Sequence, residues 1–214
     1  MPSAFITFEG PEGSGKSTQA GFLTEALNEH GFKVKLTREP GGDPVSEEIR
    51  KIILDGSDNS ITDRTELLLY ESARAQHCER IVRPHLDAGE IVICDRFTDS
   101  TVAYQGYGNG LEIALINRLN DFATGGLKPD LTFLLDVDVS LGLNRQGDWN
   151  RMERKEIDFH QRVRHGFLEE AAKARKRIAV IDASSDIQTI REQIMTEVAE
   201  RLGIDLRQCE GGMP

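Results

Sequence analysis

A glycine-rich pattern, G-x-x-x-x-G-K-[ST], lies near the start of the chain. It is formed by Gly10, Pro11, Glu12, Gly13, Ser14, Gly15, Lys16 and Ser17. Glycines let the backbone curl so that successive N–H groups point at one anion, and a following helix N-terminus adds its dipole. In this pattern the lysine reaches the outer phosphates and the Ser hydroxyl coordinates Mg²⁺. We therefore expect residues 10–18, including Thr18, to bind ATP or GTP, with Lys16 catalytic.

A second site signal is an acidic residue at the end of an apolar run. Residues 91–95 read Ile-Val-Ile-Cys-Asp, and Arg96 follows at once. Alone, this pattern is more often a plain strand end, but beside a phosphate loop Asp95 becomes the second candidate for the Mg²⁺ shell with Ser17. An arginine fixed at such a strand end can bind a phosphate through two hydrogen bonds. We expect Asp95 and Arg96 to be catalytic.

The secondary-structure elements that carry these residues follow from the apolar periodicity. Short, nearly unalternated apolar runs predict strands covered on both faces at 4–9, 33–37, 91–95, 131–136 and 178–182. Helical periods lie between them, at about 16–30, 44–54, 63–88, 111–123, 156–176 and 186–202. The alternation predicts an α/β protein: a three-layer α/β/α P-loop NTPase fold around a five-stranded parallel sheet. We expect one domain over 1–206 and a disordered tail at 207–214.

Two segments break this alternation and are expected to be loops. Residues 97–110 are polar and Gly-rich and follow a strand, which is where α/β folds bind ligands. Residues 145–155 are polar and basic without an apolar period, and predict a short lid. Residues 141–177 carry ten Lys/Arg against six Asp/Glu, a net charge of +4, on a chain whose net charge is −10. That contrast fits either a solvated mixed-charge helix or local handling of an anion.

Composition excludes several protein classes. A net charge of −10 argues against a general nucleic-acid binder. No apolar run approaches the roughly 18 residues of a membrane span, and the N-terminus has no signal-peptide pattern, so we expect a cytoplasmic protein without a membrane partner. Three cysteines, Cys78, Cys94 and Cys209, form no CxxC pair, and the five histidines show no ligand spacing. We expect no metal site made by protein side chains alone. A switch GTPase is disfavoured because no [NT]-K-x-D segment occurs.

Longer motifs resemble one family. FEGPEGSGKSTQ, TREPGG at 37–42, DRFTDSTVAYQG at 95–106, PDLTFLLDV at 129–137 and RxExxxIDFHxRVR at 151–164 occur in the order and at the spacings of bacterial thymidylate kinases. The resemblance runs from about residue 4 to 182. It implies ATP-dependent phosphorylation of dTMP to dTDP with Mg²⁺, in dTTP biosynthesis. It also implies a homodimer, to which the 63–88 helix could contribute.

The resemblance assigns an acceptor site position by position. Tyr70 matches an aromatic that stacks on thymine and Arg74 an arginine at the base edge; their i, i+4 spacing puts both on one helix face. Gln105 matches a thymine-reading glutamine, whose amide can donate and accept. Tyr104 matches a residue that crowds the sugar 2′ position. The other implied substrate-binding residues are Glu12, Glu39, Pro40, Arg50, Arg96, Ser100 and Thr101.

Within that set the implied roles differ. Arg50 and Arg96 match acceptor-phosphate arginines, and Pro40 stiffens the turn that carries Glu39. Glu12 corresponds to an acidic residue that meets the acceptor sugar or its water. A carboxylate in a phosphate loop otherwise repels the donor, which supports a role on the acceptor side.

The resemblance also implies a catalytic lid arginine. The variable positions of the phosphate loop hold no Lys or Arg, and related sequences then supply the cation from the lid. Arg151 falls on that position, with Arg145 and Arg154 as alternatives, and Trp149 is a candidate reporter of lid closure.

One departure concerns the loop YQGYGN, where the family usually has YQGGGR or YQGAGR. Tyr107 and Asn109 put its local shape in question. Two rival functions also stay open: a kinase for another monophosphate or a deoxynucleoside, and a P-loop ATPase whose turnover drives a partner.

Overall fold

The computed structural model describes residues 3–54, 61–145 and 155–206. Its sheet has five strands in the order β2-β3-β1-β4-β5, and every neighbouring pair is parallel. The strands are β1 (Ala4–Glu9), β2 (Val34–Arg38), β3 (Ile91–Asp95), β4 (Leu131–Asp136) and β5 (Ile178–Asp182). The predicted five-stranded parallel sheet is confirmed, with β2 shifted by one residue.

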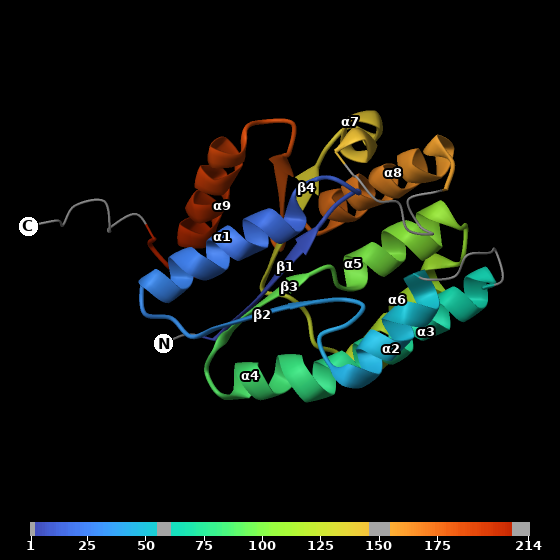
Figure 1. Ribbon diagram of the computed structural model, residues 1–214, viewed down its shortest axis with the longest axis horizontal. Helices are drawn as coiled ribbons and strands as arrows, with labels where there is room; N and C mark the ends of the chain where they lie inside the picture. Colours follow the sequence, from blue (N-terminus) through green and yellow to red (C-terminus); the bar gives the residue numbers. More distant parts are fainter. Residues whose placement is uncertain (1–2, 55–60, 146–154, 207–214) are drawn as a thin grey trace, which may run out of the picture.

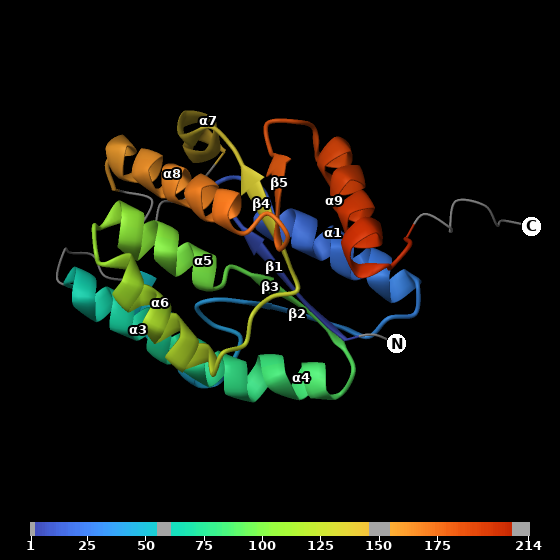
Figure 2. The same ribbon diagram turned by 180° about the vertical axis from the view of Figure 1, so that it is seen from behind.

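Helices cover both faces of this sheet (Figures 1 and 2). They are α1 (Lys16–Glu29), α2 (Pro44–Leu54), α3 (Asp63–His77), α4 (Arg83–Asp87), α5 (Thr98–Thr101), α6 (Ile113–Thr124), α7 (Val139–Asn144), α8 (Ile157–Lys173) and α9 (Ile187–Leu202). Two π-helical segments, η1 (Cys78–Val82) and η2 (Val102–Gly108), continue α3 and α5. The predicted α/β/α layering is confirmed. Among the described residues, no helix has both the length and the apolar character needed to cross a membrane.

The two faces of the sheet bury separate apolar layers, which explains why the strands do not alternate. Leu23 and Leu27 of α1 and Ile194 of α9 pack on one face, against strand residues such as Ile6 and Phe133. On the opposite face α8, η1 and η2 cover strand residues that include Phe5, Val92 and Leu134. Burial on both faces fixes the strands, and with them the edge where they end.

The parallel register brings the carboxyl ends of three strands together at that edge. Asp95 of β3 pairs with Phe8 of β1 and with Arg38 of β2. The glycine-rich loop therefore leaves β1 beside Asp95 and Arg38. This is the carboxyl edge of the sheet, where α/β proteins place their ligand sites.

The segment 97–110 is helical, so the expected loop is wrong. α5 and η2 run through it and pack along α8 (Figures 1 and 2). A Cβ on Gly108 would lie 2.6 Å from the Phe159 ring, so the glycine permits the two helices to approach. Local composition favoured a loop, but tertiary packing decides the conformation here.

Two other elements differ from expectation. The predicted helix 63–88 is continuous only by including η1. Pro84, in the first turn of the following helix α4, lacks the N–H that an α-helical bond to residue 80 requires. The short helix α7 was not predicted, although Asp138 caps it by accepting from the N–H groups of Ser140 and Leu141. α7 leads directly out of the sheet edge toward the glycine-rich loop.

Candidate functional site

The glycine-rich loop joins β1 to α1 with backbone angles that suit glycine. Gly10, Gly13 and Gly15 have φ values of 141°, 67° and 87°. Gly13 also lies against α7, because a Cβ there would be 1.9 Å from the carbonyl oxygen of Gly142. The loop is thus clamped between the sheet edge and α7, and no larger residue fits at position 13.

Lys16 folds back over this loop. Its Nζ donates to the carbonyl oxygens of Pro11 at 2.8 Å and Gly10 at 3.1 Å, and to Ser14 Oγ at 3.3 Å. Burial, reinforced by the nearby charge of Arg96, lowers the pKa of Lys16 to about 8. The ammonium group is held by weak neutral partners that a phosphate can replace.

Ser17 and Asp95 meet beside this lysine. The Ser17 hydroxyl donates to Asp95 Oδ2, while Asp95 Oδ1 is buried and has no hydrogen-bond partner among the described residues. A hydroxyl, a carboxylate and an unused buried oxygen form the kind of oxygen donor set that Mg²⁺ prefers. In the described part of the chain, no group of three or more His, Cys, Asp or Glu could hold a metal ion.

Arg96 stands at the centre of the cavity on a strained backbone. Its φ of 70° is unusual for a residue with a side chain. Buried Glu9, at the end of β1, holds the following turn: Oε1 accepts from the N–H of Phe97 at 2.8 Å, and Oε2 accepts from the Ser100 hydroxyl at 2.5 Å. Burial and the neighbouring charge of Asp99 raise the pKa of Glu9 to about 7. Glu9 was not among the predicted site residues, although it ends an apolar strand as Asp95 does.

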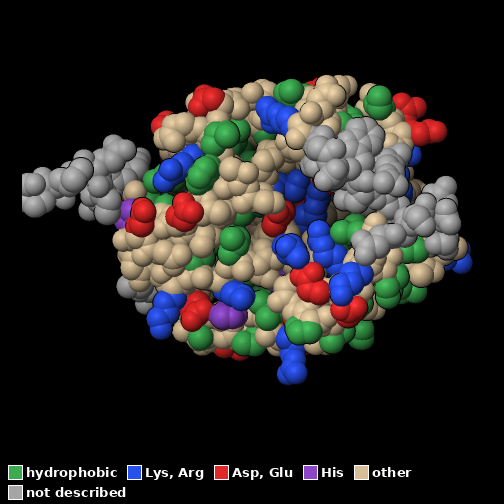
Figure 3. All heavy atoms as spheres, viewed as in Figure 1, with side chains coloured by type: hydrophobic (Ala, Val, Ile, Leu, Met, Phe, Trp, Pro, Cys, Tyr) green, Lys and Arg blue, Asp and Glu red, His purple; other side chains and the backbone are tan. Residues whose placement is uncertain are grey.

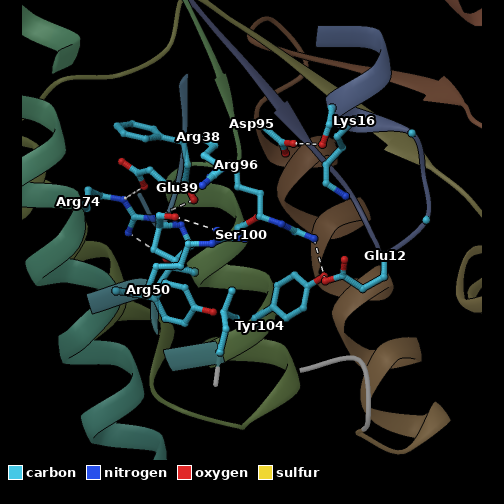
Figure 4. A pocket seen from close by; sticks show the side chains of 18 of the residues that line it. Glu12, Lys16, Arg38, Glu39, Arg50, Arg74, Asp95, Arg96, Ser100 and Tyr104 are labelled. Carbon is cyan, nitrogen blue, oxygen red and sulfur yellow. Dashed lines mark hydrogen bonds and ion pairs between the residues drawn. The ribbon is translucent and has the colours of Figure 1, made fainter. Parts of the chain in front are cut away.

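Glu12 of the glycine-rich loop is the focus of two side chains from the far wall. Arg96 Nη2 and the Tyr104 hydroxyl both donate to its Oε1 at 2.8 Å (Figure 4). Burial opposes ionisation of Glu12, but the charges of Arg96 and Lys16 outweigh it and lower the pKa. The Arg96 guanidinium also lies 5.1 Å from the Tyr104 ring centroid. Glu12 is therefore a carboxylate directed across the cavity, toward Arg96 and Tyr104.

Arg74 is the centre of a buried network on the opposite side. Its Nε donates to Glu39 Oε2 at 2.8 Å, and the side chain is 2% exposed. Its other partners are Glu71 Oε1, Thr101 Oγ1, Asn120 Oδ1 and the Phe97 carbonyl oxygen. Burial alone lowers the pKa of Arg74, but Glu39 and Glu71 raise it above its ordinary value. His77 completes the arrangement, since its Nδ1 lies 2.9 Å from Glu39 Oε1.

These groups line one cavity of about 480 Å³, around which Lys and Arg side chains gather (Figure 3). All eleven residues predicted for the acceptor side line it: Glu12, Glu39, Pro40, Arg50, Tyr70, Arg74, Arg96, Ser100, Thr101, Tyr104 and Gln105. From the donor side, Gly13, Gly15, Lys16, Ser17 and Thr18 line it, as does Asp95. Gly10, Pro11 and Ser14 lie behind this wall, where they hold Lys16. The individual roles of these residues stay predictions.

The lining also includes side chains for which no site role is predicted from the sequence. Arg38, Leu54 and Phe97 belong to it. Arg38 donates to Glu47, and Arg50 donates to the Pro40 carbonyl oxygen. Burial, with Arg38 nearby, lowers the pKa of Arg50. The Glu47 carboxylate interacts electrostatically with both arginines, which together form a cationic part of the cavity lining.

Comparison with known proteins decides the family. A family profile described as "Thymidylate kinase" matches residues 8–194. A protein of Geotalea daltonii named thymidylate kinase is 49% identical over 208 residues, covering 92% of this chain and 97% of that one. One from Pseudomonas putida, of the same name, is 46% identical over 197 residues, covering 91% and 94%. The chain belongs to the thymidylate kinase family. A solved thymidylate kinase structure from Ehrlichia chaffeensis is 37% identical, with a TM-score of 0.77 over 92% of this chain and 99% of that one.

The unusual Tyr107 of the YQGYGN segment is accommodated by its packing against α8. The Tyr107 ring packs on α8 at Gly166, where a Cβ would lie 2.6 Å from the ring. Its hydroxyl donates to Glu170 Oε1 at 3.2 Å. A tyrosine at 107 is thus matched by a glycine at 166, and the loop continues as the regular π-helix η2.

The predicted thymidylate kinase lid falls mostly outside the described residues. Arg151 and Arg154, together with Trp149, lie in 146–154, so their predicted roles are untested. Arg145 is described and lines the cavity beside the glycine-rich loop. Its Nη1 donates to the Ala183 carbonyl oxygen at 3.0 Å and approaches that of Gly13 at 3.4 Å.

Proposed function

We propose that this member of the thymidylate kinase family transfers the γ-phosphoryl group of ATP to dTMP, with Mg²⁺, in cytoplasmic dTTP synthesis. Relatives that match nearly the whole chain are named thymidylate kinases. One observation carries the assignment beyond the family. A single cavity joins the cradle residues Lys16 and Ser17 to a wall that holds Tyr70, Arg74 and Gln105.

The donor phosphates bind over the glycine-rich loop, where backbone N–H groups and the start of α1 face them. Lys16 exchanges its carbonyl partners for phosphate oxygens and follows the charge of the moving group. Ser17 and Asp95 would hold Mg²⁺, which neutralises phosphate charge when bound.

The acceptor base binds on the α3 side of the cavity. The Tyr70 ring stacks on thymine, and Arg74 and Gln105 address its edge. Tyr104, fixed by its hydrogen bond to Glu12, crowds the 2′ position of the sugar. The geometry supports these roles because all four side chains line the same cavity.

The acceptor phosphate lies between Arg50 and Arg96, opposite Lys16. Arg96 keeps its direction through Glu12 and Ser100. The acceptor phosphate is already anionic at pH 7, so positioning and charge stabilisation suffice and no strong general base is required. The lid cation is Arg151, a role that rests on the resemblance alone.

The protein forms a homodimer through α2, α3 and α6. These three helices are neighbours, and they carry exposed apolar residues: Val45, Ile52, Leu68, Leu115 and Phe122, the last of which is 86% exposed. Exposed apolar side chains on neighbouring helices are typical of protein interfaces. Sedimentation velocity should give a dimer mass for the purified protein and a monomer mass for Phe122→Asp.

The function is tested by a panel of monophosphates with ATP and Mg²⁺. Initial rates are measured with dTMP, dUMP, dCMP, AMP, GMP and CMP, and ADP release is measured without an acceptor. dTMP should be the best acceptor, with dUMP behind by a modest margin, because one methyl group in an apolar pocket is worth about 1–3 kcal/mol. A faster rate with AMP, GMP or CMP rejects the acceptor. ADP release that does not need any acceptor supports the ATPase alternative instead.

A further inference from the structure

Behind Gln105 lie three polar side chains that the proposed reaction does not use: Glu66, Asn109 and Lys155. Together with Gln105 they form a row joined by hydrogen bonds. Gln105 Nε2 donates to Glu66 Oε1 at 2.9 Å. Asn109 Nδ2 donates to the same oxygen at 3.0 Å, and Lys155 Nζ donates to Asn109 Oδ1 at 2.7 Å. Glu66 belongs to α3, is 1% exposed, and is not one of the described residues that line the cavity. The row links α3, η2 and the start of α8.

The two charged members of this row, Lys155 and Glu66, fix the donor and the acceptor of each hydrogen bond in it. An ammonium group only donates hydrogen bonds and a carboxylate only accepts them. Lys155 therefore fixes the Asn109 amide with its oxygen outward, and Glu66 receives the NH₂ groups of both Asn109 and Gln105. An amide flip at Gln105 would place its oxygen 2.9 Å from a buried carboxylate oxygen, and two acceptors at that distance repel.

We infer that Glu66 is a specificity-determining positioning residue, which holds Gln105 with its carbonyl oxygen as the group offered to the acceptor base. The inference rests on the proposed function, in which Gln105 addresses the base. Thymine and uracil carry a donor at N3, which an amide oxygen can accept. Cytosine carries an acceptor at N3, which the fixed oxygen repels. Glu66 thereby selects bases with an N3–H, although it touches no ligand.

The test compares dTMP with dCMP in Glu66→Gln. The new amide can accept or donate, so Gln105 becomes free to flip and to offer its NH₂ group to cytosine. The ratio of kcat/KM for dTMP to kcat/KM for dCMP should fall by about tenfold, the worth of roughly one hydrogen bond. Glu66→Asp keeps an acceptor-only group and should restore most of the ratio. Asn109→Ala removes the other donor to the same oxygen and should leave the ratio near its original value.

A purely structural role makes a different prediction. If Glu66 only supports the structure, Glu66→Gln lowers the rates with both acceptors together and leaves their ratio unchanged. That result would overturn the inference. In a Gln105→Leu background, Glu66→Gln should change the ratio no further, because Glu66 acts through Gln105. An undiminished ratio in Gln105→Leu alone also overturns the inference, even if the Glu66 variant does not fold. The proposed function stands or falls separately, on whether dTMP is the best acceptor of the unaltered enzyme.

Discussion

The two walls of the cavity are built in opposite ways. The donor wall is one contiguous run, residues 10–18, whose shape comes from glycine backbone angles and a helix start. The acceptor wall draws side chains from the helical elements α2, α3, α5 and η2 and from the loops after β2 and β3, and hydrogen bonds centred on Arg74 hold part of it. A backbone wall can contact phosphate groups whatever base they carry, whereas a side-chain wall can distinguish one base from another. Changes to the donor wall should therefore reduce turnover, and changes to the acceptor wall should alter acceptor affinity.

The largest expected effect is on the donor wall, in Lys16→Ala. Removal of the ammonium group should lower kcat on the order of 10²- to 10³-fold, because its charge follows the phosphoryl group into the transition state. The KM for dTMP should change little. Steady-state kinetics with each substrate varied in turn checks this, and a rise confined to the KM for dTMP would contradict the division between the walls.

On the acceptor wall, Arg74→Ala should raise the KM for dTMP at least tenfold and leave the KM for ATP nearly unchanged. Because Arg74 is the buried partner of Glu39 and Glu71, the variant should also lose about 3–5 kcal/mol of stability. Thermal unfolding and kinetics well below the melting temperature separate the two losses. The matched control is Arg83→Ala, which removes a partly buried arginine bonded to the carbonyl oxygens of Thr124 and Gly125, outside the cavity. A higher KM for ATP alone would show that Arg74 does not serve the acceptor.

A smaller effect should follow from backbone strain in Gly13→Ala. The added methyl group would meet the Gly142 carbonyl oxygen at 1.9 Å, at a φ of 67°. The loop must shift, so the KM for ATP should rise about tenfold while dTMP binding, measured by calorimetry without ATP, is retained. Gly21→Ala is the control, because no heavy atom lies within 4 Å of its Cβ and helix α1 favours alanine. Equal increases in the KM for ATP in the two variants would show that the contact between the loop and α7 does not shape the ATP site.

The smallest expected effect is a pH dependence of kcat/KM for ATP, caused by Lys16 of the donor wall. Burial lowers the pKa of Lys16 to about 8, so the free enzyme loses the ammonium charge as pH rises through 8. The kcat/KM for ATP should fall above that pH, while kcat, which reports the bound state, should fall only at higher pH because phosphates stabilise the ammonium group. Lys16→Arg should lack the limb near pH 8. The same limb in that variant would assign the titration to another group.

The difference between the walls also explains what the sequence could predict. Residues 10–18 and Asp95 were predicted from spacing alone, because local backbone and strand-end rules govern them. The acceptor residues came from the family resemblance, since no local pattern joins Arg50, Tyr70 and Gln105. Glu9 and Phe97 escaped prediction because their contact spans 88 positions in the chain.

Local sequence patterns likewise predict only part of the fold. Strand positions followed from burial on both faces, as the apolar run at 91–95 illustrates. The helices α5 and η2 were missed because their conformation depends on packing against Phe159 and Val163 of α8, which composition does not reveal. Asp138 carried a usable capping signal for α7, which was not recognised.

In the proposed reaction, one cavity holds the donor on its backbone wall and dTMP on its side-chain wall. A crystal structure with dTMP, Mg²⁺ and a non-hydrolysable ATP analogue would test this arrangement. We expect the thymine ring against Tyr70 with its edge at Arg74 and Gln105, the dTMP phosphate at Arg50 and Arg96, and the analogue phosphates at Lys16. A dTMP molecule whose base lies away from Tyr70 and Arg74, or whose phosphate occupies the glycine-rich loop, would contradict it.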